Sequence, residues 1–282
     1  MPQPAFPHAP RLVVTDLDGT LFNSRHQCSP ANLATLRELG RRGVIRVIAT
    51  GRSPYSAHHV LSSDFPIDYL VFSSGAGILA WPSQRLLFAH HLVAPDIQHA
   101  IQVFLAHDAD FMLHEPIPDN HRFWYRASGR ANPDFQRRRE WYRDFAAPFD
   151  ASAAAPEGAS QFVAIEPAAS GLAFYERVAP LLAPLTVVRA TSPFDGESFW
   201  MEIFPPHVSK ADASAWIAAR HQIPQAASLA VGNDYNDCAL LEWGGVSVVV
   251  ANAPAELKAL YPSVASNDAD GFSDAVKSWM PS

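Results

Sequence analysis

The sequence predicts an α/β protein with a parallel sheet and a second, inserted domain. Short apolar runs alternate with amphipathic helical segments near both ends of the chain, the pattern of parallel strands joined by crossover helices. From about residue 82 to 204, this alternation gives way to sequence rich in aromatic residues and arginine. A chain of 282 residues is long enough for two domains. We therefore expect a core built from residues 1–81 and 205–282, with an α+β domain inserted at 82–204.

The outer segments follow strand and helix patterns in turn. Residues 11–16 (RLVVTD) form a short apolar run that predicts a strand. The next segment predicts a helix, because Ser29 can cap it, Pro30 suits its first position and Gly43 can end it. Strand and helix patterns then continue through residues 44–50, 68–77, 209–222, 227–237, 245–261 and 269–280. Ligands of such sheets bind beyond the carboxyl ends of the strands, so those ends are where we expect the site.

The inserted segment shows fewer signals of structure and function than the two outer segments. Residues 162–167 (FVAIEP) and 199–204 (FWMEIF) predict strands. Between His121 and Asp144 there are seven arginines and three acidic residues. These arginines either form a solvated face or contact an anionic part of a substrate. Arg122 and Arg126 are our candidates for substrate contact.

Composition excludes several classes of protein. The two cysteines are far apart in sequence, which argues against a disulfide framework and favours a reducing, cytoplasmic compartment. The first ten residues lack the order of a signal peptide, and no apolar run is long enough to cross a bilayer. A net charge of −7 argues against broad nucleic-acid binding, because phosphate backbones require a basic face. We expect neither nucleic acid nor membrane as a partner, and the sequence predicts no oligomeric state.

Acidic side chains follow two of the predicted strands. Asp16 and Asp18 come directly after the first strand, and the run GNDYND at 232–237 follows a later one. Two neighbouring carboxylates repel each other unless a cation lies between them or one is protonated. A helix cap or an Asx turn would explain one of the two aspartates better than both. Two acidic strand ends favour a hard divalent cation with oxygen ligands, which indicates Mg²⁺.

Two further positions indicate an anion. Thr50 ends the second predicted strand, and its hydroxyl with the backbone amides from Gly51 onward can hold an anion. Lys210 begins a predicted helix, where the helix dipole disfavours a cation, so its position suggests an anionic partner. A solvated surface lysine is the alternative interpretation of Lys210.

These motifs together resemble the haloacid dehalogenase (HAD) superfamily of phosphohydrolases. The order is DLDGT at 16–20, a threonine at a strand end, a lysine, and GNDYND at 232–237. Four further segments resemble the Cof-like (type IIB) branch of this superfamily. In that branch a large C2-type cap is inserted into a Rossmann-like core. The four segments are ATGR at 49–52, SSGA at 73–76, VANA at 250–253 and SNDADGF at 266–272. The resemblance covers roughly 160 residues of the two outer segments.

The resemblance implies a role for each motif residue. Asp16 would be the nucleophile that forms an aspartyl-phosphate. Asp18 would protonate the leaving group and then activate water. The implied metal site would hold Mg²⁺ through Asp16, Asp18, Asn233, Asp234 and Asp237. The implied phosphate site would bind the phosphoryl group through Thr50, Gly51, Lys210 and Asn236.

The sequence departs from the family pattern at three positions. Asn233 stands where the family usually has aspartate, so it offers a carbonyl oxygen without charge, and Asp234 is an alternative ligand. Ser74 and Ala211 replace an asparagine and a glycine of the family motifs. Because the reactive residues are all present, we expect an active enzyme.

Three functions remain open at this point. The first is a phosphomonoesterase acting on a small phosphorylated metabolite such as a sugar phosphate. The second is a phosphomutase that returns the phosphoryl group to a sugar. The third is a non-catalytic sensor of phosphorylated metabolites, which the neutral Asn233 would suit.

Overall fold

The computed structural model describes residues 11–152, 154 and 156–280 and divides into two compact units. The core unit comprises the described residues up to Arg52, residues 57–88 and those from Ser209 onward, and the cap unit comprises 53–56 and 89–208. Helix α2 (Pro54–His58) is divided between them. The main inserted segment thus runs from 89 to 208, where the sequence suggested 82 to 204. The later start arises because residues 85–89 form a strand that joins the core sheet.

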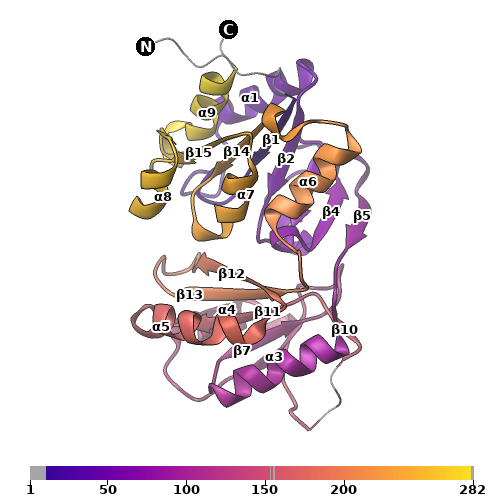
Figure 1. The fold of residues 1–282 in the computed structure, drawn as a ribbon, viewed down its shortest axis with the longest axis vertical. Helices are drawn as coiled ribbons and strands as arrows, with labels where there is room; N and C mark the ends of the chain where they lie inside the picture. Colours follow the sequence, from indigo (N-terminus) through magenta and orange to yellow (C-terminus); the bar gives the residue numbers. More distant parts are fainter. Residues whose placement is uncertain (1–10, 153, 155, 281–282) are drawn as a thin grey trace. The chain divides into compact units, whose positions relative to one another are not determined.

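The core unit contains an eight-stranded sheet in the order β16-β15-β14-β1-β2-β3-β4-β5 (Figure 1). Its strands are β1 (Leu12–Thr15), β2 (Ile45–Ala49), β3 (Tyr69–Phe72), β4 (Gly77–Ala80), β5 (Arg85–Ala89), β14 (Ser228–Gly232), β15 (Val246–Val250) and β16 (Ser263–Val264). From β16 to β3 every neighbouring pair is parallel, and β4 runs antiparallel to β3. The predicted parallel α/β core is confirmed.

The central position of β1 fixes the location of the candidate site. All four residues of β1 are buried, as expected for a strand covered on both faces. It pairs with β14 in the register Thr15↔Val231 and with β2 in the register Thr15↔Ile48. The residues that follow these three strands therefore lie next to one another at one edge of the sheet.

Helices connect the strands of the core unit. They are α1 (Pro30–Arg41), α6 (Lys210–Arg220), α7 (Cys238–Trp243), α8 (Ala255–Leu260) and α9 (Gly271–Trp279). The predicted start of α1 is confirmed, because the Ser29 side chain accepts a hydrogen bond from the Asn32 amide and Pro30 is the first helical residue. Among the helices of the described residues, none is long and apolar enough to cross a membrane.

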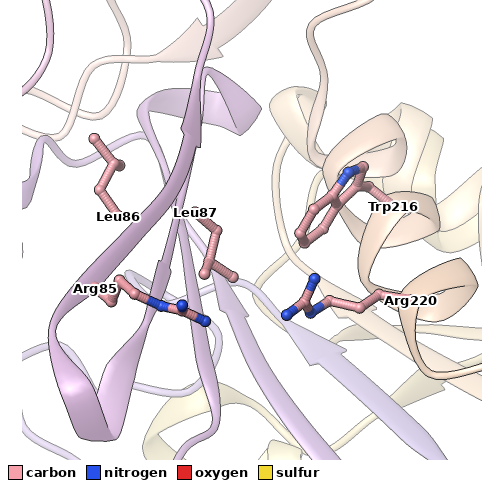
Figure 2. Close-up of a pocket in the computed structure, with 5 residues that line it drawn as sticks. All are labelled: Arg85, Leu86, Leu87, Trp216 and Arg220. Atoms are coloured by element: carbon pink, nitrogen blue, oxygen red, sulfur yellow. The ribbon is translucent and has the colours of Figure 1, made fainter.

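A cavity of about 200 Å³ lies between the edge strand β5 and the C-terminal half of α6 (Figure 2). Its five lining residues are Arg85, Leu86, Leu87, Trp216 and Arg220. The two arginine side chains point toward each other across it, and Trp216 forms one wall. None of the predicted catalytic, metal-binding or phosphate-binding residues lines this cavity.

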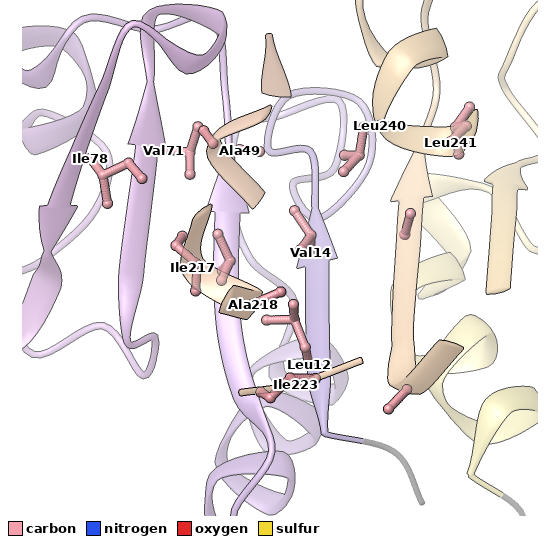
Figure 3. Close-up of a cluster of buried hydrophobic side chains, with 14 of the residues drawn as sticks. Leu12, Val14, Ala49, Val71, Ile78, Ile217, Ala218, Ile223, Leu240 and Leu241 are labelled. Atoms are coloured by element: carbon pink, nitrogen blue, oxygen red, sulfur yellow. The ribbon is translucent and has the colours of Figure 1, made fainter. Parts of the chain in front are cut away.

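One face of the core sheet packs against α6, α7 and α8. Leu12 and Val14 of β1 meet Ile217 of α6 and Leu240 of α7 in a single buried cluster (Figure 3). Because side chains alternate along a strand, Val13 and Thr15 point to the opposite face. This packing holds β1 rigidly, which fixes the position of the aspartates that follow it.

The cap unit is built on a six-stranded sheet in the order β12-β13-β11-β7-β8-β9. Its strands are β7 (Phe111–His114), β8 (Phe123–Arg126), β9 (Ala146–Pro148), β11 (Gln161–Glu166), β12 (Thr186–Thr191) and β13 (Phe199–Phe204). A separate two-stranded pair joins β6 (Leu92–Val93) to β10 (Gly158–Ala159). The predicted strands at 162–167 and 199–204 and the α+β character of the insertion are confirmed.

The two faces of the cap sheet are covered differently. Helices α3 (Ala94–Ala106) and α5 (Ala168–Val178) pack on the face that includes Phe162 and Leu113. Helix α4 (Pro133–Trp141) packs through Phe135 on the face that includes Val163. The basic segment expected from the sequence thus lies partly on α4.

Candidate active site

Asp16 and Asp18 occupy a tight turn immediately after β1. The Asp16 amide donates to the Val231 carbonyl over 2.9 Å, which continues the pairing of β1 with β14. The chain then turns at Gly19, whose φ of +76° suits glycine. Asp16 is only 5% exposed, so its carboxylate must find partners inside the protein.

Lys210 supplies a cation to this buried carboxylate. Its side chain is fully buried, and its Nζ donates to Oδ1 of Asp16 over 2.7 Å and to Oδ1 of Asp237 over 2.6 Å. Although burial disfavours the charged amine, the charges of the two carboxylates raise the pKa of Lys210 above its usual value. The predicted anionic partner of Lys210 is therefore, in this structure, a pair of aspartates.

Burial dominates the protonation of Asp16. Removal from water raises its pKa to about 7, against the lowering effect of the Lys210 charge and with smaller raising contributions from Asp237 and Asp18. A nucleophilic carboxylate must be ionised, so additional positive charge at Asp16 would favour its reactive form.

Asp237 organises the acidic loop that follows β14. Its Oδ1 accepts from Lys210, and its Oδ2 accepts from the backbone amides of Asn233, at 2.8 Å, and Asp234, at 3.2 Å. Close packing supports this arrangement, because a Cβ at Gly232 would lie 2.6 Å from the Asp237 Cβ. Both oxygens of Asp237 thus hold protein groups, and its main effect is to position Lys210 and Asn233.

The Asn233 amide faces both aspartates of the first motif. One end of the amide lies 3.2 Å from Oδ2 of Asp16, 3.1 Å from the Asp18 carbonyl oxygen and 2.8 Å from Oγ1 of Thr20. With nitrogen at this end, the amide donates to these oxygens. With oxygen at this end, the Thr20 hydroxyl donates to it over 2.8 Å, and the two aspartate oxygens face it without a proton between them, an arrangement that a cation would stabilise.

This oxygen group fits a magnesium ion. Octahedral Mg²⁺ holds oxygens at about 2.1 Å, which places neighbouring ligands about 3.0 Å apart. The separations from the Asn233 amide to Asp16 Oδ2 and to the Asp18 carbonyl are close to that value. Within the described ranges, no group of three or more His, Cys, Asp or Glu side chains is arranged for a metal. The fitting set instead combines one carboxylate, one backbone carbonyl and one amide.

Arg52 holds the side chain of Asp18. The Arg52 guanidinium donates from Nε to Oδ2 over 2.6 Å and from Nη2 to Oδ1 over 2.7 Å, and Nδ1 of His26 lies 3.3 Å from Oδ1. Burial opposes ionisation of Asp18, but the hydrogen bonds and charge of Arg52, with a smaller contribution from His26, lower its pKa. No contact with Asp18 was predicted for Arg52 from the sequence, although the residue ends the ATGR motif.

Thr50 lies beside the first motif at the end of β2. It is buried, its hydroxyl accepts from the Arg52 amide over 3.2 Å, and its carbonyl accepts from the Ser74 amide over 3.0 Å. Ser74 has a φ of +52° in the short 3-10 helix η1 (Ser73–Gly75). Gly75 is required there, because a Cβ would lie 2.2 Å from the Ser209 carbonyl oxygen. This loop therefore supports both Thr50 and the start of α6.

The remaining predicted residues lie in different places. Gly51 follows Thr50, and Asn236 lies half-buried with Asp234 at the turn η6 (Tyr235–Asp237). In the cap unit, Arg126 donates to Asp108 and to the Ala109 carbonyl. Arg122 is exposed, with its guanidinium over the ring of Phe145. Of the two arginines, Arg122 is the one whose exposed side chain is compatible with the predicted contact to a substrate.

The fold and the site together define a hydrolase core of HAD type: aspartates at the end of a central parallel strand, a lysine that joins Asp16 to an acidic loop, and an inserted cap unit. A family model described as haloacid dehalogenase-like hydrolase matches residues 13–276, and the chain belongs to this family.

Individual relatives agree with this assignment. Phosphatase YwpJ of Bacillus subtilis (strain 168) is 24% identical over 299 residues, which cover 95% of this chain and 99% of that protein. Among solved structures, the HAD phosphatase BT1666 from Bacteroides thetaiotaomicron has a TM-score of 0.77 at 20% identity and covers 97% of this chain and 96% of its own. The HAD subclass IIB sugar phosphatase BT4131 has a TM-score of 0.77 at 16% identity, covering 95% and 98%. The prediction of a HAD-type phosphatase is confirmed.

Proposed function

We propose that this protein is a Mg²⁺-dependent phosphomonoesterase that hydrolyses a small phosphorylated metabolite through an aspartyl-phosphate. The observation that carries the proposal is the environment of Asp16. One of its oxygens contacts Lys210, and the other faces the Asn233 amide and the Asp18 carbonyl. A buried carboxylate between a fixed cation and a set of metal-compatible oxygens is suited to attack phosphorus.

The proposed metal ligands are Asp16 Oδ2, the Asp18 carbonyl and the Asn233 amide oxygen. Asp234 and Asp237 then act on the loop, as their backbone contacts suggest. When bound, Mg²⁺ supplies positive charge that offsets repulsion between the nucleophile and the substrate phosphate. It would also favour the ionised form of Asp16, whose pKa burial raises.

In the first step, an oxygen of Asp16 attacks phosphorus and the bond from phosphorus to the ester oxygen breaks. Asp18, in its protonated form, gives its proton to the departing alkoxide. Lys210 and Thr50 bind the phosphoryl oxygens, with amides from Gly51 onward and the Asn236 side chain near them. The product of this step is the alcohol and the aspartyl-phosphate.

In the second step, water attacks the phosphorus of the aspartyl-phosphate. Asp18, now ionised, takes the proton of that water, and the bond from phosphorus to Asp16 breaks to release phosphate. Arg52 favours the ionised form of Asp18 and so supports this step. The first step needs the protonated form, so Asp18 must loosen its contact with Arg52 during the cycle.

We further propose that the cap unit selects the substrate. The chemical motifs lie outside 89–208, so its side chains can change which leaving group fits without changing phosphoryl transfer. Arg122 and Arg126 are the sequence-based candidates. A sugar phosphate is the substrate class suggested by the sugar phosphatase BT4131, which shares this fold. The low cysteine content, two residues far apart in the sequence, supports a cytoplasmic location.

Phosphate release from a panel of phosphate esters, measured with Mg²⁺ and with excess chelator, tests the proposal. Hydrolysis should require Mg²⁺, and Asp16→Asn should abolish turnover while leaving the circular dichroism spectrum unchanged. The intermediate should appear as about 80 Da of added mass on the peptide containing Asp16 after an acid quench. Near-normal turnover by Asp16→Asn, or undiminished activity in chelator, would overturn the assignment.

The same panel separates the other two candidates. A phosphomutase would transfer phosphate between sugars and release little of it as free phosphate. A sensor would bind phosphorylated metabolites without turnover, and the neutral Asn233 is the observation that favours it.

A further inference from the structure

Two arginines face each other across the cavity of about 200 Å³ between β5 and α6 (Figure 2). Arg85 begins the edge strand β5, and Arg220 is the last residue of α6. The side chains of Leu86, Leu87 and Trp216 complete the lining. All five residues belong to the core unit, so the cavity is formed within one compact body.

The charges of these two arginines are not neutralised by the protein around them. Among the described residues, neither side chain forms an ion pair with a carboxylate. Residues 69–95, which contain β5, and 213–233, which contain most of α6, include no aspartate or glutamate. Asp68, which like Arg220 influences the pKa of His221, accepts hydrogen bonds from Arg46 on both carboxylate oxygens, at 2.9 Å each. Two like charges thus face one cavity without a counter-ion, and an anion between them would interact favourably with both.

Structural roles explain each of the two charges separately. An arginine in the last turn of a helix complements the helix dipole, and a charged residue on an edge strand discourages pairing with another chain. Side chains directed into solvent would fulfil both roles equally well. These roles therefore do not explain why both guanidinium groups point into one hollow between β5 and α6.

Trp216 gives the cavity a fixed apolar wall. Its ring meets the ring of Phe88 edge-on, with the centroids 5.2 Å apart, and the Arg220 guanidinium lies 5.4 Å from the Trp216 centroid. Trp216 and Leu87 also pack against the buried cluster of the core sheet. The cavity is therefore preformed, with apolar walls and two converging cations, a composition that suits a small anion.

We infer that this cavity binds the phosphate group of a small molecule. A guanidinium offers a planar fork of N–H donors that matches the oxygens of phosphate or carboxylate. A carboxylate carries one negative charge, whereas a phosphate group carries about 1.5 to 2 at neutral pH and so balances both arginines. The volume is below the roughly 300–1,000 Å³ of sites for drug-sized ligands, so the ligand is small. Inorganic phosphate and an organic phosphate with a short apolar part share this chemistry.

This site is separate from the candidate active site. In the sheet order, β5 lies four strands from β1, a distance of about 19 Å at roughly 4.8 Å per strand. Along α6, Arg220 lies ten residues after Lys210, a rise of about 15 Å. Attack by Asp16 requires phosphorus within about 3.5 Å, so a phosphate held between the two arginines is not a substrate. The inference thus goes beyond the proposed function and does not depend on it.

The indole signal of Trp216 reports binding at this cavity. The chain has seven tryptophans, and Trp216→Phe identifies which indole signal of a ¹H–¹⁵N spectrum belongs to Trp216. Inorganic phosphate and propylphosphonate, which is not hydrolysed, are titrated separately into the protein in chelator at constant ionic strength. At least one of them should shift the Trp216 signal saturably. Tighter binding of propylphosphonate assigns the site to an organic phosphate, and tighter binding of inorganic phosphate assigns it to the free ion; both outcomes support the inference.

Arginine variants decide whether the shift reports this cavity. Arg85→Gln and Arg220→Gln should each weaken binding by 10-fold or more, because each removes one of the two cations. Arg37→Gln, at an exposed position of α1, should leave the affinity unchanged within 2-fold. A phosphate bound at the catalytic motifs would not respond to Arg85→Gln, so a shift that persists in both cavity variants overturns the inference.

The absence of a specific signal would also overturn it. That result is a Trp216 signal that neither compound shifts saturably, or one that chloride shifts equally at the same ionic strength. Circular dichroism of each variant checks that the fold is retained. The readout needs no turnover, so it remains decisive if the phosphate-release panel finds no phosphatase activity.

Discussion

Replacing Lys210 by methionine is the perturbation that the structure defines most sharply. Methionine fills a similar volume but removes the charge between Asp16 and Asp237. Both aspartates are buried and both contact Nζ within 2.7 Å, so neither has solvent to replace the lost cation. Breaking a buried ion pair from one side costs about 3–5 kcal/mol. We expect the metal-free variant to lose about 4 kcal/mol in the free energy of unfolding, together with its phosphatase activity.

The loss should depend on pH in a known direction. Burial raises the folded-state pKa of Asp16 to about 7, so between its ordinary value and pH 7 the folded state holds more protons than the unfolded state. Stability contributed by this group is therefore present at low pH and falls as pH rises through that window. Removing Lys210 takes away a charge that lowers the pKa of Asp16, which extends the fall above pH 7. The stability difference between wild type and Lys210→Met should thus change little between pH 5 and pH 6 and grow as pH rises through 7 to 8.

Urea unfolding followed by circular dichroism at pH 5, 6, 7 and 8, in chelator, measures this difference. Lys277→Met, at an exposed position of α9, controls for loss of a lysine and should differ from wild type by less than about 0.5 kcal/mol. The double variant Lys210→Met/Asp237→Asn should recover part of the stability, because it leaves one buried carboxylate in place of two. A Lys210→Met variant within 1 kcal/mol of wild type, with a difference that is flat in pH, would refute the reasoning.

Four further outcomes are expected. Asn233→Asp should lower the Mg²⁺ concentration for half-maximal activity by about 3-fold or more, since it adds charge to a proposed ligand, and Ca²⁺ should restore chelated enzyme poorly; metal titrations check both. Arg52→Gln should raise the pKa of Asp18, so the pH–rate limb that reports Asp18 should move to higher pH. Gly75→Ala should lower the free energy of unfolding by more than about 2 kcal/mol and remove most of the phosphatase activity. Gly43→Ala, also at positive φ but with open space around its Cβ, should lower the free energy of unfolding by about 1 kcal/mol and leave kcat unchanged.

Much of the core could be predicted because its signals are local. The apolar run before Asp16 and the Ser29–Pro30 start of α1 each depend on a few neighbouring residues, and both are found in the structure. The strand β5 was placed in the insertion instead, because an edge strand has exposed and half-buried residues and lacks the apolar run of a central strand. The main segment of the compact cap unit therefore starts at residue 89, whereas the sequence predicts a start at residue 82.

The site was predictable in its residue types more than in its contacts. Acids at two strand ends indicated a cation, but the sequence could not show that Asp237 uses both oxygens on protein groups. The contact from Arg52 to Asp18 joins loops 34 residues apart, and it depends on the register of two strands.

The amide at position 233 has a consequence for the metal-free state of the proposed Mg²⁺ site. An aspartate there would add a third negative charge beside Asp16 and Asp18 whenever the cation departs. An amide has two chemically different ends, and a half-turn about its last side-chain bond exchanges a lone pair for a hydrogen-bond donor. The nitrogen end then meets the same oxygens that the cation would hold. At the proposed Mg²⁺ site, rotation of this one side chain would replace the interactions of a departing cation with hydrogen bonds.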